Sequence, residues 1–153
     1  MELAKATSLQ FEVSETGHQI VQAEINGHTV RLILDTAAGA SVLDRACIKK
    51  LGIQEELSEG NAAGLGTAEH EMGLIDVVKF ELAGQLYEST QFVSLNLDHV
   101  QAAGGGNSIH GLLGSPFFRK YQAILDFGTN TLTIKLNEIK GSNLDFRHQI
   151  ANS

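Results

Sequence analysis

The clearest candidate for chemistry in this sequence is an aspartate followed by small residues. Asp35 ends the apolar run Leu32-Ile33-Leu34 and precedes Thr36, Ala37 and Ala38. Burying an unpaired carboxylate is costly, so such a group needs a partner or a position near solvent. The small side chains would let another backbone, or a substrate, approach it closely. The segment therefore indicates a functional carboxylate at a strand end, with a structural turn residue as the alternative interpretation.

Two further segments of small and apolar residues follow downstream. Gly111-Leu112-Leu113-Gly114 predicts a short apolar strand that ends at Gly114. Ser115 and Pro116 then predict a helix, with Ser115 as its cap and Pro116 in its first turn. Between the aspartate and this strand, Gly64-Leu65-Gly66 predicts a flexible turn.

Together, these segments resemble the motifs of retropepsin-like aspartic peptidases. The first resembles hydrophobic-hydrophobic-Asp-Thr/Ser-Gly-Ala, and Gly111-Leu112-Leu113-Gly114 resembles the second motif, an apolar pair and Gly before a helix. Residues 117–121 and 123–127 resemble the helix and strand that follow in many cellular members. Gly64, Leu65 and Gly66 lie where such proteins place a mobile flap, and a plain loop is the alternative for them. The resemblance covers residues 18–136.

The sequence departs from the family pattern at three positions. Ala37 stands where the usual residue is Gly, and it adds a methyl group beside the aspartate. Gly39 stands where Ser or Thr is commoner, and His110 stands where relatives often have Asp. The first two departures motivate a second hypothesis, a non-catalytic peptide-binding or dimerisation module on the same fold.

The resemblance implies that Asp35 is catalytic and that it needs a second carboxylate. Two carboxylates one hydrogen bond apart share a proton, because like charges so close do not both ionise. One then acts as base on a water and the other as acid toward the scissile carbonyl. Five other aspartates lack a Thr or Ser and small residues directly behind them: Asp44, Asp76, Asp98, Asp126 and Asp145. The sequence therefore predicts a homodimer, in which twofold symmetry brings Asp35 from each subunit to one axis.

The resemblance also implies roles for the neighbouring segments. Thr36 would bridge the two active-site loops beneath the carboxylates. Residues 64–67 would close over an extended peptide, whose backbone pairs with the flap and the cleft edges. The expected partner is therefore a peptide or protein substrate, and the expected activity is that of an aspartic endopeptidase.

Short strands and tight turns must position these residues. Residues 19–25 and 28–34 predict two strands joined by Asn26-Gly27, a pair suited to a type I′ turn. A short helix is expected over residues 44–51, capped by Asp44 and ended by Gly52.

The rest of the pattern is also one of strands and loops. It predicts strands over residues 74–82 and 85–95 around Ala83-Gly84, a hairpin over 123–127 and 131–136, loops over 54–63 and 102–107, and a polar tail from 137. The expected fold is mostly β: a retropepsin-like closed or folded β-barrel with two short helices. We expect a single domain over residues 1–153, with its core at about 18–136.

Composition excludes several other classes. The formal net charge of −7 and scattered basic residues disfavour a nucleic-acid binder. The six histidines and the single cysteine, Cys47, form no recognised metal spacing, and no glycine segment has the Gly-Lys-Ser/Thr of a phosphate loop, so neither a metal nor a cofactor is expected. No apolar run is long enough to span a membrane. A soluble, cytoplasmic protein is the default expectation, and a removed signal peptide is left open.

Overall fold

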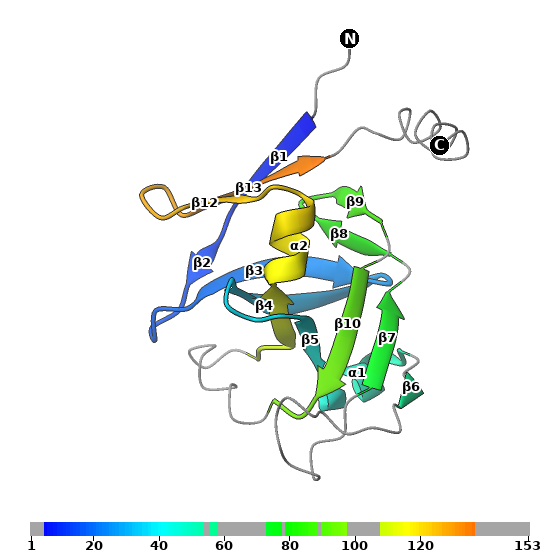
Figure 1. The fold of residues 1–153 in the computed structure, drawn as a ribbon. Helices are drawn as coiled ribbons and strands as arrows, with labels where there is room; N and C mark the ends of the chain where they lie inside the picture. The colour runs from blue at the N-terminus through cyan, green and yellow to red at the C-terminus, as the bar shows by residue number, and fades with distance from the viewer. Residues whose placement is uncertain are drawn as a thin grey trace, which may run out of the picture.

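The computed structural model describes residues 5–53, 56–57, 73–77, 79–88, 90–97 and 108–136. In this part of the chain, strands dominate and two short helices interrupt them, which confirms the predicted mostly-β fold. The strands form a large sheet in the order β6 (Glu56–Leu57), β7 (Gly73–Val77), β10 (Thr90–Leu95), β5 (Ser41–Asp44), β11 (Gly111–Gly114), β4 (His28–Asp35), β3 (Gln19–Ile25), β8 (Phe80–Leu82) and β9 (Gln85–Tyr87). In addition, β2 (Glu12–Val13) pairs with β3, and a small sheet has the order β1 (Lys5–Gln10), β13 (Thr131–Leu136) and β12 (Ile124–Asp126). The large sheet curls into a half-barrel (Figure 1). The helices are too short to cross a membrane, and no other helix occurs among these residues.

The central hairpin consists of β3 (Gln19–Ile25) and β4 (His28–Asp35), as the sequence predicts. Asn26 and Gly27 both have positive φ angles, 49° and 86°, as a type I′ turn requires. The buried residues of β4 cluster at its second half, where Leu32 and Leu34 enter the core. The apolar pattern therefore drives the strand inward and delivers Asp35 at its end.

A strand and a helix follow the Asp35 turn. β5 (Ser41–Asp44) is fully buried, and α1 (Arg45–Leu51) ends at Gly52 with a φ of 71°, as expected for a helix stop. Asp44 occupies the cap position, but its side chain makes no cap bond. Its Oδ1 instead accepts the backbone N–H of Leu97 at 3.0 Å. The predicted capping interaction is therefore wrong, because this buried carboxylate serves tertiary packing.

The two long strands predicted after residue 73 are each divided. Residues 74–82 contribute β7 (Gly73–Val77) and β8 (Phe80–Leu82), and residues 85–95 contribute β9 (Gln85–Tyr87) and β10 (Thr90–Leu95). The division follows from pairing, since β7 and β10 pair with each other, while β8 pairs with β3. The chain therefore moves from one part of the sheet to another twice, once between β7 and β8 and once between β9 and β10.

The second helix and the small sheet complete the fold. β11 (Gly111–Gly114) leads directly into α2 (Ser115–Lys120), and β12 (Ile124–Asp126) and β13 (Thr131–Leu136) follow as the predicted hairpin. The cap position of α2 is Gly114, so the prediction of Ser115 as cap is wrong, while Pro116 lies in the first turn as expected. Three further strands were not predicted: β1 (Lys5–Gln10), β2 (Glu12–Val13) and β6 (Glu56–Leu57).

One hydrophobic core joins both sheets and both helices. Figure 1 shows α2 between the small sheet and the β3–β4 hairpin. Its Phe117 ring packs edge-on against Phe80 and Tyr87, with centroids 5.4 and 5.6 Å apart. Aromatic pairs in this geometry add stabilisation beyond the area that they bury. The helix that follows the second glycine motif therefore packs against β8 and β9, which lie at one end of the large sheet.

Candidate active site

The site begins where two parallel strands end together. β11 lies between β4, to which it runs parallel, and β5, to which it runs antiparallel. The register pairs Gly114 with Asp35 and Gly111 with Leu32. The two segments singled out in the sequence are therefore neighbours, and the end of β11 lies beside the aspartate.

Asp35 starts a tight turn that brings it to the surface. Its Oδ1 accepts the N–H of Ala37, and its carbonyl oxygen accepts the N–H of Ala38, both at 3.1 Å. Asp35 is half-buried, while Thr36 and Ala37 are exposed. The turn thus leaves the carboxylate partly open to solvent.

The loop after Asp35 is pressed against Gly114. A Cβ atom on Gly114 would lie 2.5 Å from the carbonyl oxygen of Ala40 and 3.1 Å from that of Ala38. Real Cβ contacts are not this short, so only glycine fits beside the loop. The N–H of Ser115 also donates to the Ala38 carbonyl at 2.9 Å. These contacts explain why β11 ends in a glycine where it meets the loop.

The buried side chain of Ser41 stabilises the same junction through a hydrogen bond. Its side chain is buried, and its Oγ accepts the N–H of Gly114 at 2.9 Å. The hydroxyl therefore links the far end of the Asp35 loop to the end of β11. Sequence reasoning missed this residue, for which the available signal was a hydroxyl side chain leading the apolar run Val42-Leu43.

The remaining positions of β11 face two different packing groups. Leu113 is fully buried in the main core, whereas Leu112 is partly buried against a smaller cluster of Ile20, Ile33 and Ile109. At Gly111 a Cβ atom would overlap the Val42 carbonyl oxygen of β5. Both faces of the strand are thus filled, which fixes its register against β4.

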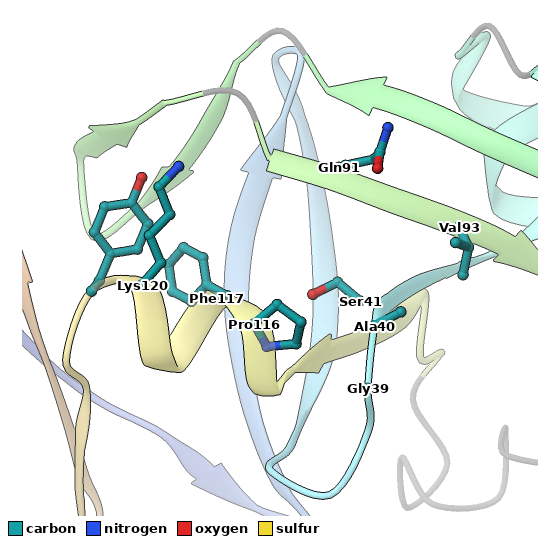
Figure 2. A pocket seen from close by; sticks show the side chains of 9 residues that line it. Gly39, Ala40, Ser41, Gln91, Val93, Pro116, Phe117 and Lys120 are labelled. Atoms are coloured by element: carbon teal, nitrogen blue, oxygen red, sulfur yellow. The ribbon is translucent and has the colours of Figure 1, made fainter. Parts of the chain in front are cut away.

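A pocket of about 270 Å³ adjoins this junction. Figure 2 shows Ser41 between the β10 side chains Gln91 and Val93 and the α2 residues Pro116 and Phe117. Asp35 does not line this pocket, so the pocket neighbours the carboxylate without containing it. Its walls are formed by Gly39, Ala40, Ser41, Gln91, Val93, Pro116, Phe117, Lys120 and Tyr121.

The structure brings Asp35, Thr36, Ala37 and Ala38 together with residues 111–114. The flap candidates Gly64, Leu65 and Gly66 lie outside the described residues, so their assignment stays a prediction. Two other aspartates are engaged elsewhere: Asp44 accepts the Leu97 amide, and Asp126 accepts the amides of its own turn.

Metal-ligating side chains and the single cysteine are further candidates for chemistry in the described part of the chain. No group of three His, Cys, Asp or Glu residues there could hold a metal ion. Cys47 is buried, and burial, reinforced by the nearby Asp44 carboxylate, raises the pKa of its thiol to about 11. This thiol stays protonated near neutral pH and is a poor nucleophile.

Comparison with known sequences gives a consistent family. A sequence model of the family described as aspartyl protease matches residues 21–117. The UBA domain-containing protein Mud1 of Schizosaccharomyces pombe is 32% identical over 122 residues, which make up 78% of this chain and 33% of that protein. DNA damage-inducible protein 1 of Cryptococcus neoformans is 30% identical over 122 residues, covering 78% of this chain and 26% of that protein. The chain spans about a third or less of the length of these relatives.

Solved structures with the same fold agree with this match. A retropepsin-like aspartic protease from Rickettsia conorii superimposes with a TM-score of 0.61 at 16% identity, covering 89% of this chain and 96% of that one. The retroviral protease-like domain of Ddi1 from Leishmania major gives a TM-score of 0.58 at 18% identity, covering 84% and 99%. At these identities the likeness establishes the fold, and the predicted retropepsin-like fold is confirmed.

Proposed function

The chain belongs to the aspartyl protease family, and from this premise we propose that it is an aspartic endopeptidase that works as a homodimer. The observation that carries the proposal is the placement of Asp35. It ends a buried strand, lies half-exposed in a turn of small residues, and is paired in register with the glycine that ends the second motif.

The proposed reaction needs two carboxylates, one ionised and one protonated. The ionised group takes a proton from a water whose oxygen attacks the peptide carbonyl carbon, and the protonated group donates to the carbonyl oxygen. The tetrahedral intermediate then loses its C–N bond as the nitrogen takes up a proton, so water is consumed and two peptide ends form. The rate should fall at both pH extremes, where the pair is either fully protonated or fully ionised.

The second carboxylate would be Asp35 of another copy. Asp44 is buried and accepts the backbone N–H of Leu97, and Asp126 lies at the end of β12, outside the two segments that carry the family resemblance of the site. Asp35, with the exposed Thr36 and Ala37, instead lies on a surface that a symmetry-related chain could reach. Thr36 would then bridge the two loops, as the family resemblance implies.

The direct experiment is cleavage of a peptide library between pH 3 and 8 by the purified protein and by Asp35→Asn. We expect the wild type to cleave and the variant to be slower by about 10³-fold or more, since it cannot ionise. Thermal unfolding of both proteins checks that the substitution leaves the fold intact. Equal cleavage by the two proteins would remove Asp35 from the mechanism.

A second candidate function is favoured by one feature of the turn. Ala37 places a methyl group beside the carboxylate, where the family pattern has glycine. If this methyl prevents two turns from meeting, the chain would bind peptides without cutting them. Peptide binding without turnover, together with turnover gained in Ala37→Gly, would support this candidate, and Asp35-dependent cleavage by the wild type would exclude it.

A further inference from the structure

His110, directly before β11, holds neighbouring strands with both its backbone and its ring. Its N–H donates to the Arg31 carbonyl, and its carbonyl accepts the N–H of Asp44, both at 2.8 Å. The ring Nδ1 accepts the backbone N–H of Arg31 at 2.9 Å. A side-chain nitrogen thus takes the place of a backbone carbonyl at the point where β11 joins β4.

This hydrogen bond fixes the protonation state of the ring. A backbone N–H can only donate, so Nδ1 must carry a lone pair and the ring hydrogen must lie on Nε2. A protonated imidazole has no acceptor nitrogen. The Arg31 amide would then lose its partner and face an N–H group of the same polarity.

Charged groups on β4, α1 and β5 act on the ring. Burial is the main cause that lowers the pKa of His110 below its usual range, and the cations of Arg31 in β4 and Lys50 in α1 lower it further. The buried Asp44 at the end of β5 opposes them. Glu12 of β2 forms an ion pair with the Arg31 guanidinium at 2.9 Å.

Protons can reach this ring from solvent. A pocket of about 230 Å³ is lined by His110 together with Asp44, Cys47 and Lys50. The ring therefore combines a hydrogen bond that requires the neutral form with a route for acid to enter.

We propose that His110 is an acid-sensitive latch, whose neutral ring holds β11 against β4 and whose protonation releases that end of the two strands carrying Gly114 and Asp35. β4 runs directly from Arg31 to Asp35, and β11 runs from Gly111, next to His110, to Gly114. Loosening the strands at the Arg31 and Gly111 end therefore weakens the support of the site at the other end. The effect on catalysis rests on the proposed function, whereas the effect on stability does not.

The direction of the pH effect follows from linkage. Because the folded pKa is lowered, the unfolded chain binds this proton at a higher pH than the folded one does. The latch therefore stabilises the fold fully above the unfolded pKa of about 6.5. That contribution is lost progressively as the pH falls below this value.

The substitution His110→Asn separates the effect of the hydrogen bond from the effect of the charge on the ring. In His110→Asn, the side-chain oxygen can accept the Arg31 amide but does not titrate. His28→Asn is the matched control, because His28 is exposed at the start of β4. We expect the melting temperature of the wild type and of the control to fall between pH 7.5 and pH 5 by about 3–6 °C more than that of His110→Asn. Equal falls in all three proteins would overturn the proposal.

Hydrogen exchange at the Arg31 amide measures directly whether the hydrogen bond to the His110 ring is formed. After correction for the intrinsic pH dependence of exchange, its protection should drop at least about tenfold in the wild type at pH 5 and stay unchanged in His110→Asn. If His110→Asn does not fold, an NMR titration of the wild-type His110 ring decides the matter. A ring pKa at or above the usual value, or undiminished protection at Arg31, would overturn the proposal. None of these measurements needs a substrate, so they stand whether or not the chain proves to be a peptidase.

Discussion

At its carboxyl end, β11 is tied by the Ser41 hydroxyl, which accepts the Gly114 amide. At its amino end it is tied by the His110 ring, which accepts the Arg31 amide. Both ends thus use a side chain where a sheet would ordinarily use a carbonyl. The hydroxyl does not titrate over the physiological range, whereas the imidazole does.

The glycines at the two ends differ as well. Gly111 lies against the backbone of β5 inside the sheet, while Gly114 lies against the loop that carries Asp35. The same absence of a side chain therefore serves the fold at one end and the site at the other. This difference predicts which substitutions damage stability and which damage activity.

The largest effect should come from Gly111→Ala. The added methyl would overlap the Val42 carbonyl oxygen and lie 3.1 Å from the Leu43 Cα, and neither backbone group can move without breaking the sheet. We expect the free energy of unfolding, measured in urea, to fall by about 3 kcal/mol or more. A loss below about 1 kcal/mol would mean that β11 has more freedom than its register implies.

Gly114→Ala should separate activity from stability. Its methyl would push on the carbonyls of Ala40 and Ala38, which lie in a partly exposed loop that can yield more easily than a buried strand. We expect a stability loss of about 1–3 kcal/mol and a fall in kcat of about 100-fold or more, because the loop displaces Asp35. Retention of full peptidase activity in a folded Gly114→Ala protein would contradict this division.

Ser41→Ala should have a smaller combined effect than Gly114→Ala, because it lowers stability without adding a methyl group that pushes on the Asp35 loop. Removing the hydroxyl leaves the Gly114 N–H without its acceptor, at a cost of about 1–3 kcal/mol. Ser41→Thr keeps the hydroxyl, and the adjoining pocket of about 270 Å³ offers room for its methyl, so it should be close to wild type. The loss in Ser41→Ala should be the same at pH 5 and pH 7.5, unlike the change at His110. A strongly pH-dependent loss would remove the contrast between the two ends.

The smallest effect should come from Gly39→Ala. A Cβ atom there would meet nothing within 4 Å, and the backbone is not in a conformation that demands glycine. Stability should change by no more than about 0.5 kcal/mol. This variant is also the matched control for Gly114→Ala, because Gly39 lies in the loop that Gly114 packs against.

Local pattern was enough to predict the parts of this fold that depend on neighbours in sequence. Asn26-Gly27 predicted a hairpin whose two positive φ angles are observed, and Gly52 ends the helix as expected. The apolar run before Asp35 correctly predicted a buried strand.

The errors in the predicted structure arose where contacts between segments far apart in sequence determine the fold. Asp44 was predicted to cap its helix, but the Leu97 amide takes its carboxylate instead. The division of residues 74–95 into four strands depends on which partner each piece pairs with. β1 was missed because its pairing with β13 joins residues far apart in sequence.

The candidate site was likewise predictable only in its local motifs. Asp35 and the glycine motif were recognisable as motifs, yet their pairing in register is a property of the folded sheet. Ser41 and His110 gave little signal, because an isolated hydroxyl or imidazole reveals its role only when its partner amide is known.

Mixing experiments test most directly whether one active site is formed by the Asp35 residues of two chains. Wild-type and Asp35→Asn chains would be co-refolded at constant total concentration, and cleavage of a peptide would be measured against the wild-type fraction. A shared dyad predicts that activity follows the square of that fraction, so an equal mixture retains about one quarter of the wild-type rate. A linear fall, with about one half of the rate in the equal mixture, would show that each chain carries a complete site and would contradict the account.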